Sequence, residues 1–327
     1  MTLDQKTITV FGGTGFLGRH IIWQLAKTGA NIRVATRSKE RAYFLRPAGS
    51  VGQITPVLCS IHSDQSVASV LDGATHAIYL PGLLYERGKF GTFKKVHVEA
   101  AERVARAAKA ARLQVLVHFS ALGAALDAPS EYLRTKAEGE SKAIHAFSRT
   151  AILRPGVVFG PEDDFFNKFA GMERLYPLMP LIAGGKTQLQ PVYVGDIAKA
   201  VYNIIADPEC DRHGGHIYEL GGPATYTLRQ LMELTGKHTG KNKCYLPLPL
   251  PVAKIAGAMS SLCSAILSSK PALTVDQVKT LTRNSILQPG SPGLKELGVT
   301  ATDVEAILPT YLARFKQGGR FGSVPNA

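Results

Sequence analysis

A glycine-rich turn near the start of the chain has the spacing of a phosphate-binding loop. Glycines at positions 12, 13, 15 and 18 follow an apolar run that ends at Phe11 and precede a helical run, residues 19–28. Glycines at 12, 15 and 18 permit a tight turn, close approach of backbone N–H groups to a pyrophosphate, and close packing of helix on strand. The helix N-terminus adds unsatisfied donors that face an anion. This context predicts a dinucleotide site that includes Gly12, Thr14, Gly15, Phe16, Leu17 and Gly18.

The residues after the second apolar run bear on the choice of nucleotide. Folds that select NAD place an acid at this point to bond the ribose 2′-hydroxyl, but this chain has Thr36, Arg37 and Ser38. An acid would repel a 2′-phosphate, whereas Arg37 would attract it through charge-assisted bonds, with Ser38 and Arg41 assisting. We therefore expect NADP(H) rather than NAD(H). The alternative is that Arg37 is an ordinary solvated side chain.

Short apolar, β-branched runs alternate with helical segments through the first half of the chain. That alternation is typical of βαβ units and a parallel sheet. It predicts an α/β fold, a Rossmann doubly wound parallel sheet with a smaller, mostly helical C-terminal region. Helices are expected at 98–111 and 132–147. The expected strands are Ile8–Phe11, Asn31–Ala35, Ile54–Leu58, Ala77–Leu80, Val115–Phe119 and Ala151–Leu153.

The regular alternation ends after Pro161. We expect a Rossmann domain at 1–161 with returns at about 189–222, where Pro191–Val194 and His216–Leu220 read as further strands of the sheet. Residues 162–188 and 223–327 are expected to form the smaller region.

Ser120, after the fifth strand, and the Tyr132…Lys136 pair, together with the glycine turn, resemble the short-chain dehydrogenase/reductase superfamily. The resemblance implies a reaction centre in which Ser120 bonds the substrate oxygen. Tyr132 and Lys136 lie one helical turn apart, so the ammonium can lower the pKa of the phenol and bond the nicotinamide ribose.

More distinctive stretches narrow the resemblance. They look like the NAD(P)H-binding accessory subunit of respiratory complex I, whose bacterial relatives are often described as epimerases or dehydratases. The resemblance implies a subunit that binds its cofactor structurally and docks on the membrane arm, with Leu80, Pro81 and Pro155 also near the cofactor. The stretches are Leu84–Gly88, Val96–Val98, Leu153–Asn167 and Gln190–Asp196.

The chain departs from the superfamily pattern at two places. Cys59-Ser60-Ile61 stands where Gly-Asp is usual, which removes an acid that helps to hold adenine. His97 stands where an asparagine usually supports the water chain of the active site, which argues against efficient turnover. We expect His97 to be a partly buried, hydrogen-bonded histidine. In the accessory subunit, Ser120, Tyr132 and Lys136 would then be a vestigial reaction centre.

Charge and composition limit the partners. The 327 residues carry a formal net charge of +13, and from Pro223 onward 12 Lys or Arg face 5 Asp or Glu. A basic region favours an anionic partner, such as a membrane surface or an acidic protein, although a solvated basic surface is the plain alternative. No nucleic-acid motif is present, so no nucleic-acid partner is expected.

The sequence contains no run of about 20 uninterrupted apolar residues, and the first strand begins too early to leave room for an export signal. We expect a protein that is not secreted and lies peripherally on the cytoplasmic face of a bacterial inner membrane, or on the matrix side in a mitochondrion. The four cysteines are far apart, and His213 and His216 flank a flexible Gly-Gly pair without a third ligand, so no metal is expected.

Two further segments have structural and functional interpretations. Asp163 and Asp164 precede a predicted helix, where capping by negative charge is preferred to catalysis. Large apolar residues at 252, 255, 259, 262 and 266 fall on one helical face. That face either seals the smaller region, which is the preferred interpretation, or lies on a membrane or in the groove of a partner.

Three functions remain open from the sequence. The first is the complex I accessory subunit. The second is a free NADP-dependent reductase or epimerase that uses Ser120, Tyr132 and Lys136. The third is a nucleotide-sensing regulator without chemistry. A blocked pocket and an exposed apolar C-terminal surface would favour the subunit, and an open pocket over the nicotinamide would favour the enzyme.

Overall fold

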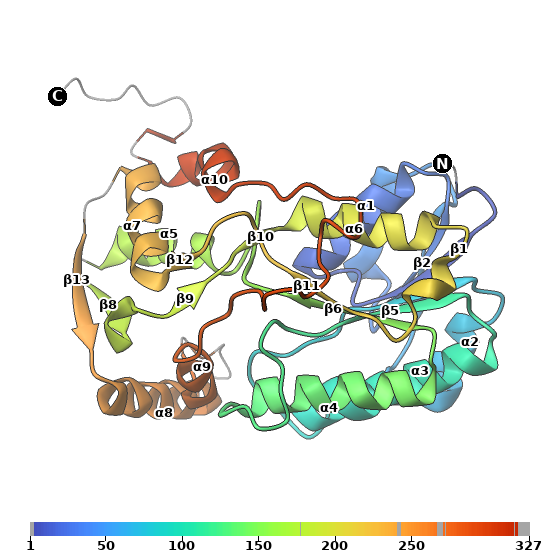
Figure 1. The fold of residues 1–327 in the computed structure, drawn as a ribbon, viewed down its shortest axis with the longest axis horizontal. Helices are drawn as coiled ribbons and strands as arrows, with labels where there is room; N and C mark the ends of the chain where they lie inside the picture. Colours follow the sequence, from blue (N-terminus) through green and yellow to red (C-terminus); the bar gives the residue numbers. More distant parts are fainter. Residues whose placement is uncertain are drawn as a thin grey trace. The chain divides into compact units, whose positions relative to one another are not determined.

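The chain folds into two compact units (Figure 1). The computed structural model describes residues 3–176, 178–240, 243–266, 271, 273–316 and 318–319, without the side chains of 261–266. Unit 1 comprises Met1–Pro155, Val194–Leu220 and Gln288–Thr300, and unit 2 comprises Gly156–Tyr193, Gly221–Leu287 and Ala301–Ala327.

Unit 1 is built on a seven-stranded sheet in the order β3-β2-β1-β4-β5-β6-β11, and every neighbouring pair is parallel. The crossover of the strand order between β1 and β4 is that of a doubly wound Rossmann sheet, which confirms the predicted fold class. The strands are β1 Thr7–Phe11, β2 Asn31–Thr36, β3 Ile54–Leu58, β4 His76–Tyr79, β5 Val115–Phe119, β6 Thr150–Pro155 and β11 Ile217–Leu220.

Helices cover both faces of this sheet, so the inner strands are buried and almost continuously apolar. Two helices pack together on one face and three on the other (Figure 1). The first pair is α1 Phe16–Ala26 and α6 Val194–Ala206, and the other three are α2 Asp64–Leu71, α3 Ala100–Ala110 and α4 Glu131–Ala146. Other helical segments of unit 1 are two 3-10 helices, Glu40–Ala48 and Cys210–His213, and one π-helical segment, Lys94–Glu99.

Residues 288–300 differ from the sequence expectation, which assigned everything after Pro223 to the smaller region. They belong to unit 1. The backbone N–H of Glu219 donates to the carbonyl of Pro292 at 2.9 Å, and the Asn203 amide donates to the carbonyl of Leu297 at 2.6 Å. The segment therefore satisfies polar groups of β11 and α6, a long-range pairing that local sequence patterns do not encode.

Among its described residues, unit 2 contains three two-stranded sheets rather than one large one. The expectation that Pro191–Val194 returns to the main sheet is wrong, because β10 (Val192–Tyr193) pairs with β7 (Val158–Phe159) inside unit 2. The second expected return, His216–Leu220, does join the main sheet as β11 beside β6. The other pairs are β9 Gln188–Leu189 with β12 Tyr226–Thr227, and β8 Leu178–Ile182 with β13 Cys244–Leu248.

Helices α5, α7 and α10 enclose the core of unit 2. The side chain of Asp163 accepts hydrogen bonds from the backbone N–H groups of Phe165, the N-cap residue of α5, and of Asn167, so the predicted capping role holds for Asp163. Nothing among the described bonds gives Asp164 the same role. Tyr311 of α10 donates to the same carboxylate at 2.6 Å. The helices are α5 Phe166–Leu175, α7 Leu228–Thr239, α8 Leu250–Ile266, α9 Val275–Thr280 and α10 Val304–Leu312, with 3-10 turns at Ala183–Gly185 and Ala313–Phe315.

Helix α8 packs with its small residues inward. Ala253 is fully buried in a cluster with Ile182 and Val278, whereas Ile255 and Met259 are exposed. The preferred expectation that the large apolar residues seal the smaller region is therefore wrong at 252, 255 and 259, and the side chains of 262 and 266 lie outside the described residues. Within the described part of the chain, no helix is long and apolar enough to cross a membrane.

Candidate functional site

The glycine turn follows β1 and is shaped by close backbone contacts. Gly12 has φ of +78°, which favours glycine, and a Cβ there would lie 3.2 Å from Cβ of Leu80. At Gly18 a Cβ would lie 2.5 Å from the carbonyl oxygen of Gly12, too close for any side chain. The two glycines thus allow α1 to pack directly against the turn.

The N-terminus of α1 is left open toward this turn. Gly15 is its N-cap residue and provides no side-chain cap, and the first turn contains no acidic residue. The leading N–H groups of a helix and its dipole favour an anion. The cradle therefore fits a dinucleotide pyrophosphate.

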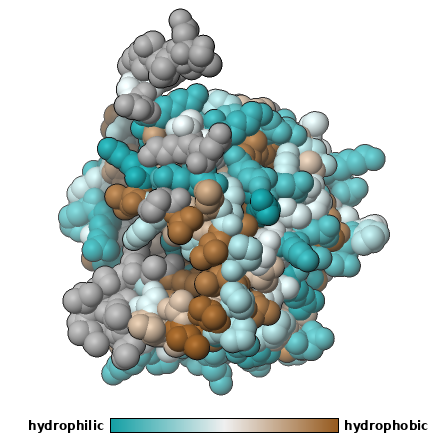
Figure 2. All heavy atoms as spheres, turned by 90° about the vertical axis from the view of Figure 1, so that its left-hand side faces the viewer, coloured by the Kyte–Doolittle hydropathy of each residue, from teal (hydrophilic) through white to brown (hydrophobic). Residues whose placement is uncertain are grey.

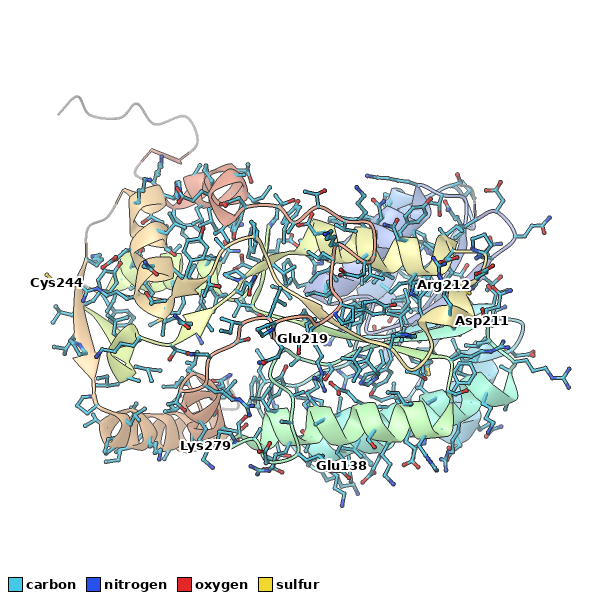
Figure 3. The ribbon with its side chains drawn as sticks, in the orientation of Figure 1. Glu138, Asp211, Arg212, Glu219, Cys244 and Lys279 are labelled. Carbon is cyan, nitrogen blue, oxygen red and sulfur yellow. The ribbon has the colours of Figure 1, made fainter. Side chains whose placement is uncertain are left out.

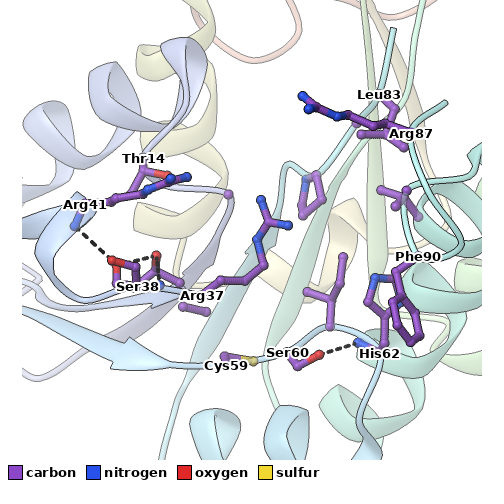
Figure 4. A pocket seen from close by; sticks show the side chains of 18 residues that line it. Thr14, Arg37, Ser38, Arg41, Cys59, Ser60, His62, Leu83, Arg87 and Phe90 are labelled. Carbon is purple, nitrogen blue, oxygen red and sulfur yellow. Dashed lines mark hydrogen bonds between the residues drawn. The ribbon is translucent and has the colours of Figure 1, made fainter. Parts of the chain in front are cut away.

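A pocket of about 920 Å³ lies at the carboxyl ends of the unit 1 strands (Figure 4). It is lined by the turn, by the residues after β2 and β3, and by the loop after β4. Its size is in the range of ligand sites. Of the residues predicted to bind the cofactor, Gly12, Thr14, Arg37, Ser38 and Pro81 line it.

The remaining predicted cofactor residues are not part of the pocket wall. Gly15, Phe16, Leu17 and Gly18 form the start of α1, Leu80 contacts Gly12, and Pro155 ends β6. Ser120, Tyr132 and Lys136 form a separate group at the ends of β5 and α4, described below.

The lining of the pocket is strongly cationic. Arg37, Arg41 and Arg87 reach it from three different segments (Figure 4), and no lining residue is acidic. His62 also lines it, and its pKa is held below the usual value by burial first and then by the positive charges of Arg103 and Lys95. The pocket is thus suited to bind phosphate groups.

Ser38 already has a partner of its own. Its hydroxyl donates to the Glu40 carboxylate at 2.6 Å, and this bond holds the pKa of Glu40 below its ordinary value. To bond a 2′-phosphate, Ser38 would have to exchange that partner. Arg37 is exposed, and the hydrogen bond between Ser38 and Glu40 does not involve it.

Sequence reasoning missed Arg87, His62 and Phe90 as pocket residues. His62 and Phe90 form a ring pair with centroids 5.5 Å apart. A signal was available, because the loops after β3 and β4 must meet at the same edge of a parallel sheet as the turn after β1. Arg87 lies in such a loop, in the stretch Leu84–Gly88 that carried the family resemblance.

Lys136 reaches the end of β5, where Ser120 follows Phe119 in the chain. The Lys136 ammonium donates to the carbonyl of Phe119 at 3.0 Å, and the buried Ser120 hydroxyl has no hydrogen-bond partner among the described residues. A Cβ on Gly82, a pocket residue, would lie 3.2 Å from Nζ of Lys136. The amine therefore lies next to the pocket wall.

The helix that carries Tyr132 and Lys136 is fixed firmly to the sheet. Ser130 caps the start of α4, and the guanidinium of Arg154 on β6 makes two bonds to Glu140, at 2.8 and 2.6 Å. The carboxylate of Glu219 lies 3.8 Å from the same guanidinium. Such bidentate pairs add geometric precision as well as energy.

The expected lowering of the phenol pKa does not occur. Burial raises the pKa of Tyr132 to about 12, and burial lowers the pKa of Lys136 to about 8. Desolvation of both groups thus outweighs the mutual effect that the one-turn spacing suggested. Tyr132 stays protonated at neutral pH and could donate a proton, but it is not a ready base.

His97 is a buried, hydrogen-bonded histidine, as expected. Its Nε2 accepts the backbone N–H of Leu83 at 2.9 Å, so Nδ1 carries the proton and faces the Thr135 hydroxyl at 3.0 Å. Burial first, and then the charge of Lys136, lowers the pKa of His97 to about 2. The neutral ring connects the loop after β4 to α4 and does not titrate near neutral pH.

The site thus combines a phosphate cradle, a cationic pocket and a buried Lys136 at the end of β5, all in unit 1. A model of the 3-beta hydroxysteroid dehydrogenase/isomerase family matches residues 9–150. Among solved structures, an NADPH-dependent quinone oxidoreductase from Escherichia coli complexed with NADPH superposes with a TM-score of 0.70 over 91% of this chain and 97% of that one. At 22% identity that likeness establishes the fold.

Curated relatives are similar over most of the chain. The mitochondrial NADH dehydrogenase (ubiquinone) 1 alpha subcomplex subunit 9 of Arabidopsis thaliana is 32% identical over 322 residues, 96% of this chain and 79% of the relative. The protein of the same name from Mus musculus is 32% identical over 299 residues, 91% of this chain and 77% of the relative. At this identity and coverage, the chain belongs to the family of the NADH dehydrogenase (ubiquinone) 1 alpha subcomplex subunit 9.

Proposed function

We propose that this protein is an NADP(H)-binding accessory subunit of the NADH:quinone oxidoreductase, respiratory complex I, and that it binds its nucleotide as a structural cofactor. The observation that carries the proposal is the cationic pocket, with three arginines and no acid in its wall, in a chain whose relatives are named as NADH dehydrogenase subunits. A nucleotide held there would order the unit that carries it, because a ligand bound only by the folded state stabilises that state.

The preference for NADP(H) rests on charge. Arg37 follows β2, where an acid would select NAD by bonding the ribose 2′-hydroxyl. A 2′-phosphate adds up to two negative charges, and guanidinium groups bind phosphate oxygens in pairs. Arg41 and Arg87 line the same pocket and would share that charge.

A structural role is supported by the group at the end of β5. The raised pKa of Tyr132 leaves no phenolate to act as a base at neutral pH, and both ring nitrogens of the neutral His97 are already hydrogen-bonded. The subunit would sit peripherally at the membrane arm, on the cytoplasmic face in a bacterium or the matrix side in a mitochondrion.

The second candidate is a free NADP-dependent reductase, favoured by the unbonded Ser120 hydroxyl beside Lys136. A nicotinamide bound above this group would supply a hydride to a carbonyl carbon. Tyr132 would donate the proton to the oxygen, which Ser120 would hold. The family model that matches residues 9–150 bears the name of a dehydrogenase family, which supports this second candidate.

One purification tests the proposal and separates the two candidates. A tag on the chromosomal copy allows mild isolation from membranes, followed by release and identification of bound nucleotide and of co-purified proteins. We expect NADPH at about one per chain, together with other subunits of the oxidoreductase. Isolation of the protein without other subunits would overturn the subunit role. Isolation with bound NADH in place of NADPH would overturn the cofactor assignment.

A further inference from the structure

Helix α8 of unit 2 buries its smallest side chains and exposes its largest. Ala253 is 0% exposed, and a Cβ on Gly257 would lie 3.0 Å from backbone atoms of Thr274 and Val275. On the other side, Ile255 is 61% and Met259 62% exposed. The small residues of the helix therefore pack closely against α9, and its large apolar side chains remain in contact with water. Exposure of these side chains does not stabilise unit 2 itself.

The exposed apolar residues form one stripe. Val252, Ile255 and Met259 are spaced by three and four positions, so they share one side of the helix, opposite to Ala253 and Gly257. We call these three residues the outer stripe of α8. Figure 2 shows that large apolar side chains also gather on the face of unit 2 formed by β8 and β13, where Leu178 and Leu246 are exposed. Cys244 of β13 points outward from the strand in Figure 3.

The stretch of sequence that contains this stripe carries charge of one sign. Between Glu233 and Asp276 the sequence contains five lysines and neither aspartate nor glutamate. Lys254 lies within α8 itself and is exposed. A one-sided apolar helix with lysines and without acids is complementary to an anionic surface that has an apolar layer beneath it, which describes the headgroup region of a phospholipid bilayer.

A protein partner that adds a β-strand fits this face less well. Both strands of the neighbouring pair contain proline, Pro180 in β8 and Pro247 in β13, and proline lacks the N–H that a new strand would need. A protein groove for α8 would have to be acidic as well as apolar, whereas an anionic bilayer combines both properties over its whole area.

We propose that α8 docks through its outer stripe on the surface of a bilayer that contains anionic phospholipids. Val252, Ile255 and Met259 enter the boundary between headgroups and acyl chains, and Lys254 stays at the level of the phosphates. The inference does not rest on the proposed function, because it concerns binding of the isolated chain to lipid. Failure of either one leaves the other standing.

Flotation of the purified full-length protein with lipid vesicles tests the proposal. The probes are phosphatidylcholine vesicles and vesicles in which a third of the lipid is phosphatidylglycerol. We expect the parent to partition at least tenfold more strongly to the anionic vesicles than to the neutral ones. Lys254→Glu should bind the anionic vesicles about fivefold more weakly than the parent. The double variant Ile255→Asp with Met259→Asp should not bind them. The matched control is Val51→Asp, a fully exposed apolar residue of unit 1.

Two results would overturn the proposal: no partitioning of the parent to anionic vesicles, or unchanged partitioning of the double variant. Thermal unfolding of each variant shows that it is folded. If the double variant does not fold, Ile255→Trp in a Trp23→Phe background replaces it, because the chain has one tryptophan. Anionic vesicles should then shift the emission of residue 255 to shorter wavelength and protect it from a soluble quencher, and unshifted emission would reject docking.

Discussion

Helix α3 of unit 1 and helix α8 of unit 2 both have apolar residues at helical spacing, but α3 buries its largest apolar residue and α8 exposes its largest ones. The buried side of α3 contains its largest apolar residue, Val104, among alanines, whereas α8 buries Ala253 and exposes Ile255 and Met259. Charged residues such as Glu102 and Lys109 cover the other side of α3. An apolar stripe in a sequence therefore identifies a surface that avoids water, but it does not tell whether the protein's own core or an external partner covers that surface.

The units should also differ in their response to acid, which is the largest effect we expect. Burial lowers the pKa of three unit 1 histidines, to about 3 for His76 and His118 and about 2 for His97, from 6.5. Because the folded pKa values are depressed, the unfolded state binds more protons below pH 6.5, and stability is lost as the pH falls. At pH 5.5 the loss should be roughly 4 kcal/mol in total. In unit 2 the shifts oppose one another, because burial lowers the pKa of His238 and raises the pKa of Asp163.

Denaturant unfolding followed by Trp23, the single tryptophan, reports on α1 of unit 1. The free energy of unfolding should fall between pH 7 and 5.5, and His118→Leu should reduce that fall by about a third. His118 suits this test because neither ring nitrogen has a hydrogen-bond partner among the described residues. A pH-independent free energy of unfolding in this range would contradict the assignment of neutral buried histidines.

The second prediction concerns the ligand that distinguishes unit 1. Arg37→Asp should weaken NADPH binding by about 1.5–3 kcal/mol, the value of a charge-assisted contact, and spare or improve NADH binding. Isothermal calorimetry measures both. The matched control is Arg46→Asp, which changes the same charge on the 3-10 helix Glu40–Ala48 without lining the pocket. Equal NADPH affinities for Arg37→Asp and the parent would refute the role of Arg37.

The third prediction compares the two sides of α8. Ala253→Leu inserts three carbons into a fully buried position and should cost about 1–3 kcal/mol, because overpacking displaces neighbours such as Val278. Ile255→Asp changes an exposed position and should stay within about 0.5 kcal/mol of the parent. Thermal unfolding of the isolated variants checks both values. A large loss for Ile255→Asp would show that the outer stripe belongs to the protein's own core.

The sequence predicted the seven strands of the main sheet because each is a short apolar run, and it predicted α1, α3 and α4, but it gave no prediction for α2 and α6. It failed where the answer depends on distant partners. The pairing of β10 with β7 and the inclusion of residues 288–300 in unit 1 arise from contacts between segments far apart in the chain. Arg87 was missed for the same reason, since its side chain becomes a pocket residue only when the loop after β4 folds back beside the glycine turn.

The smallest expected effect is that of Tyr132→Phe, and it decides what unit 1 uses its nucleotide for. If the cofactor is structural, loss of this hydroxyl should leave NADPH content and co-purification with the oxidoreductase within about twofold of the parent, with a stability change of at most about 1 kcal/mol. The reason is that a structural cofactor needs no proton transfer, and that the raised pKa of Tyr132 leaves no phenolate to act as a base at neutral pH. The measurement pairs nucleotide content with NADPH oxidation in the presence of a panel of ketones and quinones.

Arg37→Asp is the comparison, because it should lower nucleotide content. Multiple-turnover oxidation by the parent that disappears in Tyr132→Phe would instead identify Ser120, Tyr132 and Lys136 as a working reaction centre, and unit 1 as an enzyme.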